Sequence, residues 1–202
     1  MFAYNELNRY TEVYVLIRIF IDQGHNPRNP NAGAEGNGYR EQDITYKIGV
    51  ALAALLNANP EFEAMLSRNS DSEILGTSNA ESLRLRVARA NAYGADAFIS
   101  IHLNSSFITS ATGSEAYVFS LDTTAAVLAD DILLRLTEAT GYPNRGVFAR
   151  PTLYVLRKTQ MPATLIEVGY ISNPQEARFM NDNPNLYARG IYNGILTYYG
   201  FQ

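Results

Sequence analysis

Short apolar runs rich in β-branched residues alternate along this chain with segments whose apolar residues recur at helical spacing. Strands that alternate with helices usually pair in a largely parallel sheet, so the pattern predicts an α/β domain. The six predicted strands are Val15–Asp22, Phe62–Ser67, Ala97–His102, Glu115–Ser120, Leu153–Arg157 and Thr164–Val168. The predicted helices cover residues 41–57, 79–93, 123–140 and 184–199. The stretch Ser106–Glu115 is less regular, which leaves room for an antiparallel pair there.

The composition bounds the class of protein. The 202 residues, 47% hydrophobic and 18% charged, suffice for one domain with a substantial core. A net charge of −4 without a basic run argues against a nucleic-acid partner. The lack of cysteine excludes disulfides and cysteine-bound zinc, and no apolar run approaches the roughly 20 residues of a membrane span. The start lacks the basic region of a signal peptide. We expect residues 1–16 to form an extension before a domain at 17–202.

The chain has only two histidines, and each follows a predicted strand. His25 lies just past the first strand, and His102 closes the third. Ligands bind at the carboxyl ends of strands in an open α/β sheet, and imidazole is the commonest metal ligand. Either histidine alone could be a hydrogen-bonded loop residue, but the two together suggest a shared site. The long loop Gly24–Arg40, rich in Asn, Pro and Gly, adds to the candidate site.

Two histidines without cysteine require a carboxylate to complete a catalytic zinc site. Two histidines and one glutamate, with a fourth position open, are a known arrangement for hydrolysing amides. Glu35, Glu41 and Asp43 are the candidates, because all three lie between the first strand and the first helix. Glu41 stands at the expected helix N-terminus, where the helix dipole or a capping role would also favour a glutamate. Spacing alone leaves all three candidates open.

Glu167 is a charged residue within the apolar strand Thr164–Val168. Burying a carboxylate is costly unless it is paired or bound to a metal. One interpretation is a salt-bridged structural glutamate. The other puts Glu167 at the end of a third strand, facing the two histidines, where it would act as a general base on a metal-bound water.

Other polar and aromatic residues are weaker candidates. Asn104, Arg145 and Arg157 could contact sugar or peptide, but a turn cap and surface salt bridges explain them more simply. The tyrosines near the end of the chain are more typical of packing on a helix face than of a carbohydrate platform.

Four segments of the chain carry a recognisable pattern. They are IFIDQGHNP (Ile19–Pro27), YREQD (Tyr39–Asp43), DAFISIHLNSS (Asp96–Ser106) and LIEVGYISNPQE (Leu165–Glu176). In this order and spacing they resemble the zinc-dependent N-acetylmuramoyl-L-alanine amidases, and the likeness runs from about Ile17 to Phe201. The resemblance implies a single layered domain, with a mixed, mostly parallel sheet of about six strands and helices on both faces.

The resemblance also implies the roles of the site residues. His25, Glu41 and His102 match the family's ligands for one zinc ion, and Glu167 matches its catalytic glutamate. Gln23 replaces a proline that is frequent in the family's first motif, which alters the mouth of the site but leaves the histidine in place.

The expected activity follows from the same resemblance. The chain should hydrolyse the amide bond between N-acetylmuramic acid and L-alanine in peptidoglycan. It should therefore act at the bacterial cell wall, in cell separation, sporulation, germination or phage lysis. Because no wall-targeting domain is visible, a regulatory or targeting protein is a further expected partner. The alternatives are a zinc peptidase that cuts wall peptides and a non-catalytic wall-binding module.

Overall fold

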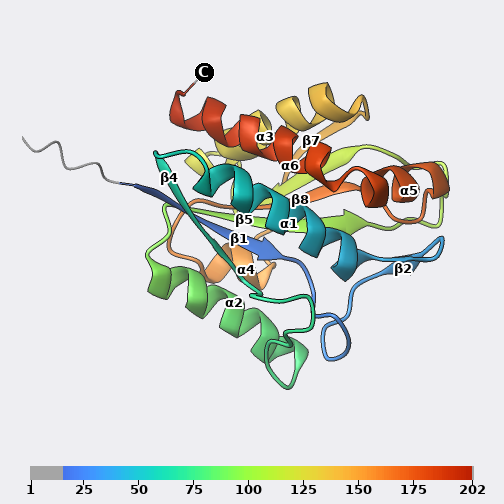
Figure 1. The fold of residues 1–202 in the computed structure, drawn as a ribbon, viewed down its shortest axis with the longest axis horizontal. Helices are drawn as coiled ribbons and strands as arrows, with labels where there is room; N and C mark the ends of the chain where they lie inside the picture. The colour runs from blue at the N-terminus through green and yellow to red at the C-terminus, as the bar shows by residue number, and fades with distance from the viewer. Residues whose placement is uncertain (1–15, 202) are drawn as a thin grey trace, which may run out of the picture.

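A six-stranded sheet lies between two layers of helices in the computed structural model, which describes residues 16–201 (Figure 1). The strands are β1 (Ile17–Gln23), β2 (Glu35–Gly36), β3 (Tyr39–Arg40), β4 (Phe62–Leu66), β5 (Ala97–Asn104), β6 (Ser114–Val118), β7 (Asn144–Ala149) and β8 (Ala163–Tyr170). The helices are α1 (Glu41–Asn57), α2 (Asn79–Tyr93), α3 (Thr124–Thr140), α4 (Tyr154–Lys158), α5 (Pro174–Asp182) and α6 (Pro184–Tyr199). The predicted fold class is confirmed. Residues 1–15 of the predicted extension lie outside the described residues.

The sheet has the strand order β4-β1-β5-β8-β6-β7. The first four of these strands are parallel, whereas β6 runs antiparallel to β8 and parallel to β7. The antiparallel pair follows the irregular stretch where the sequence left room for one. The carboxyl ends of β1, β5 and β8 therefore meet the beginning of β6 at one edge of the sheet. The small hairpin of β2 and β3 lies within the predicted loop Gly24–Arg40.

Side chains that alternate along the central strands build a core on each face of the sheet. Ile19 and Ile21 of β1 belong to the larger core, which α1, α3 and α6 cover. Phe20 points to the opposite face and stacks on Phe98 of β5, with 5.7 Å between ring centroids, beneath α2 and α4 (Figure 1). Within the described part of the chain, none of the helices has both the length and the apolar character to cross a membrane.

The predicted strand at residues 153–157 is wrong, because Tyr154–Lys158 form helix α4. A short continuous apolar run has no period that separates a strand from a helix, and here Val155 and Leu156 simply pack into the smaller core. The sixth strand is instead β7, at the edge of the sheet. It is mostly exposed, so its sequence lacks the apolar alternation that marks the other strands.

Two glycines let α6 pack closely against α3. A Cβ at Gly194 would lie 2.4 Å from the Cα of Ile132, and one at Gly190 would lie 2.9 Å from the Cα of Leu136. Because backbone cannot swing aside, Gly194→Ala is expected to lower the free energy of unfolding by about 1–3 kcal/mol, measured by urea denaturation. Asn185→Ala, at an exposed position of α6, should change it by less than about 0.5 kcal/mol. Equal losses in both variants would contradict this explanation.

Candidate metal centre

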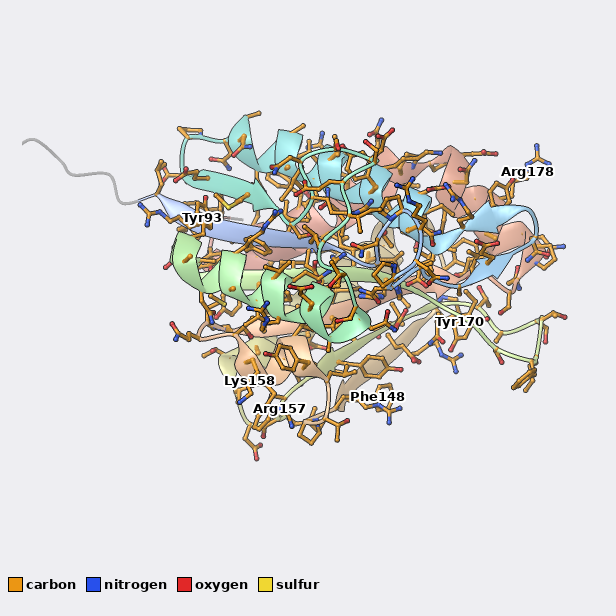
Figure 2. All side chains as sticks on the ribbon, turned by 90° about the horizontal axis from the view of Figure 1, so that it is seen from below. Tyr93, Phe148, Arg157, Lys158, Tyr170 and Arg178 are labelled. Carbon is orange, nitrogen blue, oxygen red and sulfur yellow. The ribbon has the colours of Figure 1, made fainter. Side chains whose placement is uncertain are left out.

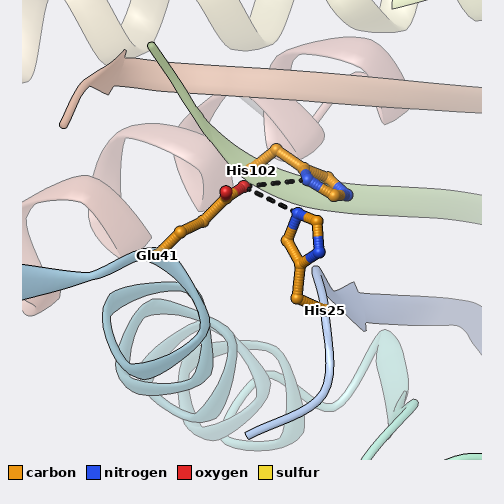
Figure 3. A group of neighbouring side chains, drawn as sticks. All are labelled: His25, Glu41 and His102. Atoms are coloured by element: carbon orange, nitrogen blue, oxygen red, sulfur yellow. Dashed lines mark hydrogen bonds and ion pairs between the residues drawn. The ribbon is translucent and has the colours of Figure 1, made fainter. Parts of the chain in front are cut away.

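His25, Glu41 and His102 converge near the carboxyl ends of the parallel strands β1 and β5, although they are far apart in sequence. Oε1 of Glu41 lies 3.2 Å from Nε2 of His25 and 3.0 Å from Nδ1 of His102. The carboxylate thus faces both imidazoles, whose ring centroids are 4.8 Å apart (Figure 3). One possible ligand atom from each residue lies within 4.8 Å of the others. The structure therefore brings together the two histidines and one carboxylate that the sequence singled out.

This donor set fits a divalent metal ion. Ligand atoms bound about 2.0–2.1 Å from a tetrahedral zinc ion lie about 3.4 Å from one another, close to the observed contacts. Nδ1 of His25 is buried without a hydrogen-bond partner among the described residues. Two imidazoles and one carboxylate, without thiolates, are also the donors of catalytic rather than structural zinc sites. The three residues can therefore hold one ion with a coordination position left open.

Glu41 reaches the site because it is the first residue of α1, directly after β3. Its Oε2 accepts a hydrogen bond from the backbone N–H of Ala34 at 2.9 Å, and its Oε1 accepts one from Leu103 at 3.0 Å. Burial alone would raise the pKa of this carboxyl, but the hydrogen bonds with His102 and His25 outweigh burial and hold its pKa well below the ordinary range. Glu41 is therefore a fixed, ionised carboxylate.

The other two carboxylates that the sequence left open lie elsewhere. Asp43 points outward and forms two 2.8 Å hydrogen bonds with Arg40. Glu35 is exposed on β2. Only Glu41 of the three joins the histidines in the described structure.

His25 adopts a left-handed backbone conformation, with φ of 68°, just past β1. Arg86 of α2 holds this turn, because its guanidinium donates to the carbonyl oxygens of Gln23 and His25 at 2.6 Å each. The same guanidinium forms a fully buried ion pair with Asp22, which also accepts a hydrogen bond from Ser100. Burial, the largest single effect, would raise the pKa of Asp22, but the charge and the hydrogen bond of Arg86, together with the hydrogen bond from Ser100, outweigh burial and lower that pKa. The pair fixes the backbone that presents His25.

Arg86 is not among the candidate residues that the sequence indicated. Its signal was present, because Arg86 lies three residues after Leu83 and one before Val87, on the inward face of the predicted helix. A charged residue on an apolar helix face requires a buried partner.

Glu167 pairs in register with His102 on β5 and with Glu115 on β6. Residues paired in this way point to the same face of a sheet, so Glu167 shares its face with His102. One of its carboxylate oxygens, Oε2, is buried without a hydrogen-bond partner among the described residues. Burial, together with the negative charges of Glu41 and Glu115, raises the pKa of Glu167 to about 8. The salt-bridged structural interpretation of this residue has no ion pair to support it among the described residues.

Comparison with known proteins identifies the family. The family model described as N-acetylmuramoyl-L-alanine amidase matches residues 19–197. The chain belongs to this family. It is 34% identical over 184 residues to the sporulation-specific N-acetylmuramoyl-L-alanine amidase of Bacillus subtilis, a match that covers 89% of the chain and 67% of that protein. It is 33% identical to the endolysin of Bacillus phage SPP1, over 86% of the chain and 64% of that protein.

Solved structures agree with this assignment. The catalytic domain of the amidase CwlV from Bacillus (Paenibacillus) polymyxa has a TM-score of 0.80 and 30% identity, covering 93% of this chain and all (100%) of that one. The CwlD amidase of Clostridioides difficile, solved in complex with the GerS lipoprotein, has a TM-score of 0.83 and 26% identity, with 92% and 99% covered. The family and the fold expected from the sequence are confirmed.

A second polar cluster lies beside Glu167 in this amidase. Glu115 accepts hydrogen bonds from Asn104 at 2.8 Å and from the hydroxyl of Tyr117, and it forms an ion pair with Arg145 at 3.2 Å. Arg145 also lies over the ring of Tyr170, 5.3 Å from its centroid. Asn104 and the exposed Arg145 thus both bind Glu115 next to the site, and both Glu115 and Glu167 face the same side of the sheet.

The remaining weak candidates lie away from the metal centre. Arg157 is exposed beside Lys158 on α4, and in Figure 2 it is far from Tyr170. It lines a different pocket, together with Met161. Tyr187 is buried against Phe179, as expected for a tyrosine that packs on a helix face.

Proposed function

We propose that the chain hydrolyses the amide bond between N-acetylmuramic acid and L-alanine in peptidoglycan, with a zinc ion held by His25, Glu41 and His102. Membership in the amidase family gives the class of reaction. The observation that carries the proposal is the convergence of these three side chains around one carboxylate oxygen, with Glu167 on the same face of the sheet.

When bound, zinc supplies Lewis acidity, which makes a water nucleophilic near neutral pH and polarises the amide carbonyl. Glu167 is the group that moves the proton. Its unpaired Oε2 accepts a proton from the attacking water and then delivers it to the nitrogen of L-alanine as that amine leaves. Burial raises the pKa of Glu167 above that of an ordinary carboxyl, toward the neutral range in which a general acid–base group works best.

Glu41 and Arg86 hold the site in a fixed geometry in the absence of substrate. Glu41 stays ionised and is anchored through both oxygens by backbone N–H groups, so it does not need to reorganise. Arg86 fixes the turn at His25 through the backbone carbonyl of that residue. Preorganised groups of this kind supply electrostatic stabilisation without a cost at the moment of reaction.

Digestion of purified peptidoglycan tests the proposal against both alternatives. An amidase releases glycan strands free of peptide, together with stem peptides that begin with L-alanine, and mass spectrometry distinguishes these from the products of a peptidase. A chelator should abolish release, and added zinc should restore it. Peptide fragments left on the glycan would indicate a peptidase, and binding without any release would indicate a non-catalytic module.

We also infer that the enzyme acts at the bacterial cell wall and has a regulatory or targeting partner. CwlD of Clostridioides difficile was solved in complex with the GerS lipoprotein, which supports such a partner for a related amidase. Crosslinking in native cells, followed by mass spectrometry, tests the inference. Recovery of the enzyme on the wall without any reproducible protein partner would contradict it.

A further inference from the structure

A partly open cavity of about 130 Å³ lies against the two histidines. His25 and His102 form part of its wall. The opposite wall is largely apolar and comes from α2, from β8 and from the segment around the start of α4. The apolar residues that line it are Leu83, Leu153, Tyr154, Val155 and Leu165.

Three of the polar side chains in the wall have partners within the protein. Asp22 and Arg86 bond to each other, and Asp22 also accepts from Ser100. Asn31 donates to Ser82 at 3.0 Å. Nδ1 of His25 has no partner among the described residues, but a buried water needs about two to four polar partners and most of the remaining wall is apolar. The cavity therefore suits an apolar group better than water.

The cavity lies close to the reacting atoms. Leu165 precedes Glu167 by two residues on β8, so the two side chains share one face of the sheet about 7 Å apart. His102, in register with Glu167, borders the same cavity. A substituent on the carbon next to the scissile amide can therefore reach the cavity while the amide itself lies at the metal centre.

The size of the cavity limits what it can hold. A water molecule occupies about 30 Å³ of liquid, and an apolar cavity of about 150 Å³ holds one benzene molecule. A volume of about 130 Å³ is slightly below the volume that holds benzene, so the cavity has room for a small aliphatic branch but not for a substituted sugar ring.

We infer that this cavity is a specificity subsite for a methyl-bearing carbon that flanks the scissile amide. The inference rests on the proposed function. In the proposed substrate such a carbon occurs on each side of the amide: the lactyl carbon on the sugar side and the α-carbon of L-alanine on the peptide side. The cavity recognises the chemistry that they share, a small aliphatic branch, and the reaction prefers substrates that carry it.

A larger side chain at Leu83 of α2, which lines the cavity, tests the inference without changing a proposed metal ligand or Glu167. The substrates are a soluble muramoyl tripeptide, an analogue with glycine in place of L-alanine, and an analogue with a glycolyl in place of the lactyl ether. The wild type should cleave the tripeptide with a kcat/KM about 10–200-fold above that of the analogue lacking the recognised methyl. Leu83→Phe should lower kcat/KM for the tripeptide but hardly for that analogue, which brings the ratio to within about threefold.

The glycine analogue lacks the alanyl methyl, and the glycolyl analogue lacks the lactyl methyl. The analogue whose kcat/KM approaches that of the tripeptide in Leu83→Phe therefore identifies which methyl the cavity binds. Leu85→Phe is the matched control, because it makes the same change two residues along α2, on another side of the helix, and it should keep the wild-type ratios. Unchanged ratios in Leu83→Phe, or an equal loss for all three substrates, would overturn the inference.

A second variant enlarges the cavity. Leu153→Ala should improve the relative kcat/KM of a substrate with a benzyl group in place of the recognised methyl by about tenfold, because a phenyl ring exceeds the volume of the wild-type cavity. A ratio identical to that of the wild type would overturn the inference even if Leu83→Phe did not fold. If the wild type cleaves none of these substrates, the proposed function fails, whereas cleavage with ratios that neither variant alters refutes the cavity subsite alone.

Discussion

Glu167→Gln is expected to keep about one zinc ion per chain and to lower kcat by about 10²–10⁴-fold. Glutamine has nearly the same shape as glutamate but cannot accept and return a proton. The substitution also keeps a side chain of the same size at a position where Oε2 has no partner among the described residues, so the fold should not suffer. Initial rates on a soluble muramoyl peptide measure the loss in turnover, and elemental analysis of the same sample measures zinc.

Glu115→Gln is the matched control for this prediction. Glu115 lies opposite Glu167 across β6 and β8, but its carboxylate is already engaged by Asn104, Tyr117 and Arg145. A glutamine there can still accept from Asn104 and Tyr117, so we expect kcat to fall less than about tenfold, below the usual range for loss of an acid–base group. Near-normal turnover in Glu167→Gln, or equal losses in the two variants, would show that Glu167 is not the proton carrier.

The features of the fold that the sequence predicted are those with a repeating physical signal. The central strands alternate between two apolar faces, as Ile19, Phe20 and Ile21 do along β1, and both faces are buried. The position of the site was predictable for a related reason. His25 and His102 each follow a strand, and parallel strands bring their carboxyl ends to one edge.

The features that residue types and spacing alone could not predict depend on contacts between distant segments, and the choice of Glu41 came only from the family resemblance. Glu35, Glu41 and Asp43 are equivalent in spacing, and only the course of the chain through β2 and β3 turns Glu41 inward while Asp43 pairs with Arg40. Strand β7 lies at an edge with little buried surface, so it leaves no apolar pattern. The backbone groups that Arg86 binds cannot be inferred from residue types, because any carbonyl can accept a hydrogen bond.

The choice of Glu41 over its neighbours gives the second large effect. Loss of a residue that only hydrogen-bonds to a metal ligand weakens metal binding by roughly 10–100-fold. Glu41→Gln is expected to weaken zinc binding by more than that, because it removes the only anionic donor of the proposed site. His102→Ala should likewise leave the purified protein without stoichiometric zinc. Competition with a fluorescent chelator measures the dissociation constant, and circular dichroism verifies that each variant is folded.

Asp43→Asn tests whether Glu41 binds zinc directly or only adds negative charge near it. Asp43 lies two residues after Glu41 on α1, so both carboxylates contribute to the field at the N-terminus of the helix, but Asp43 bonds only to Arg40 at 2.8 Å in the described structure. If Glu41 binds the metal directly, Asp43→Asn should keep zinc affinity within about threefold of the wild type, because an exposed charge pair contributes little free energy. Comparable losses of affinity in Asp43→Asn and Glu41→Gln would mean that the site attracts zinc through its general negative field. In that case the three converging side chains would not be the ligand set.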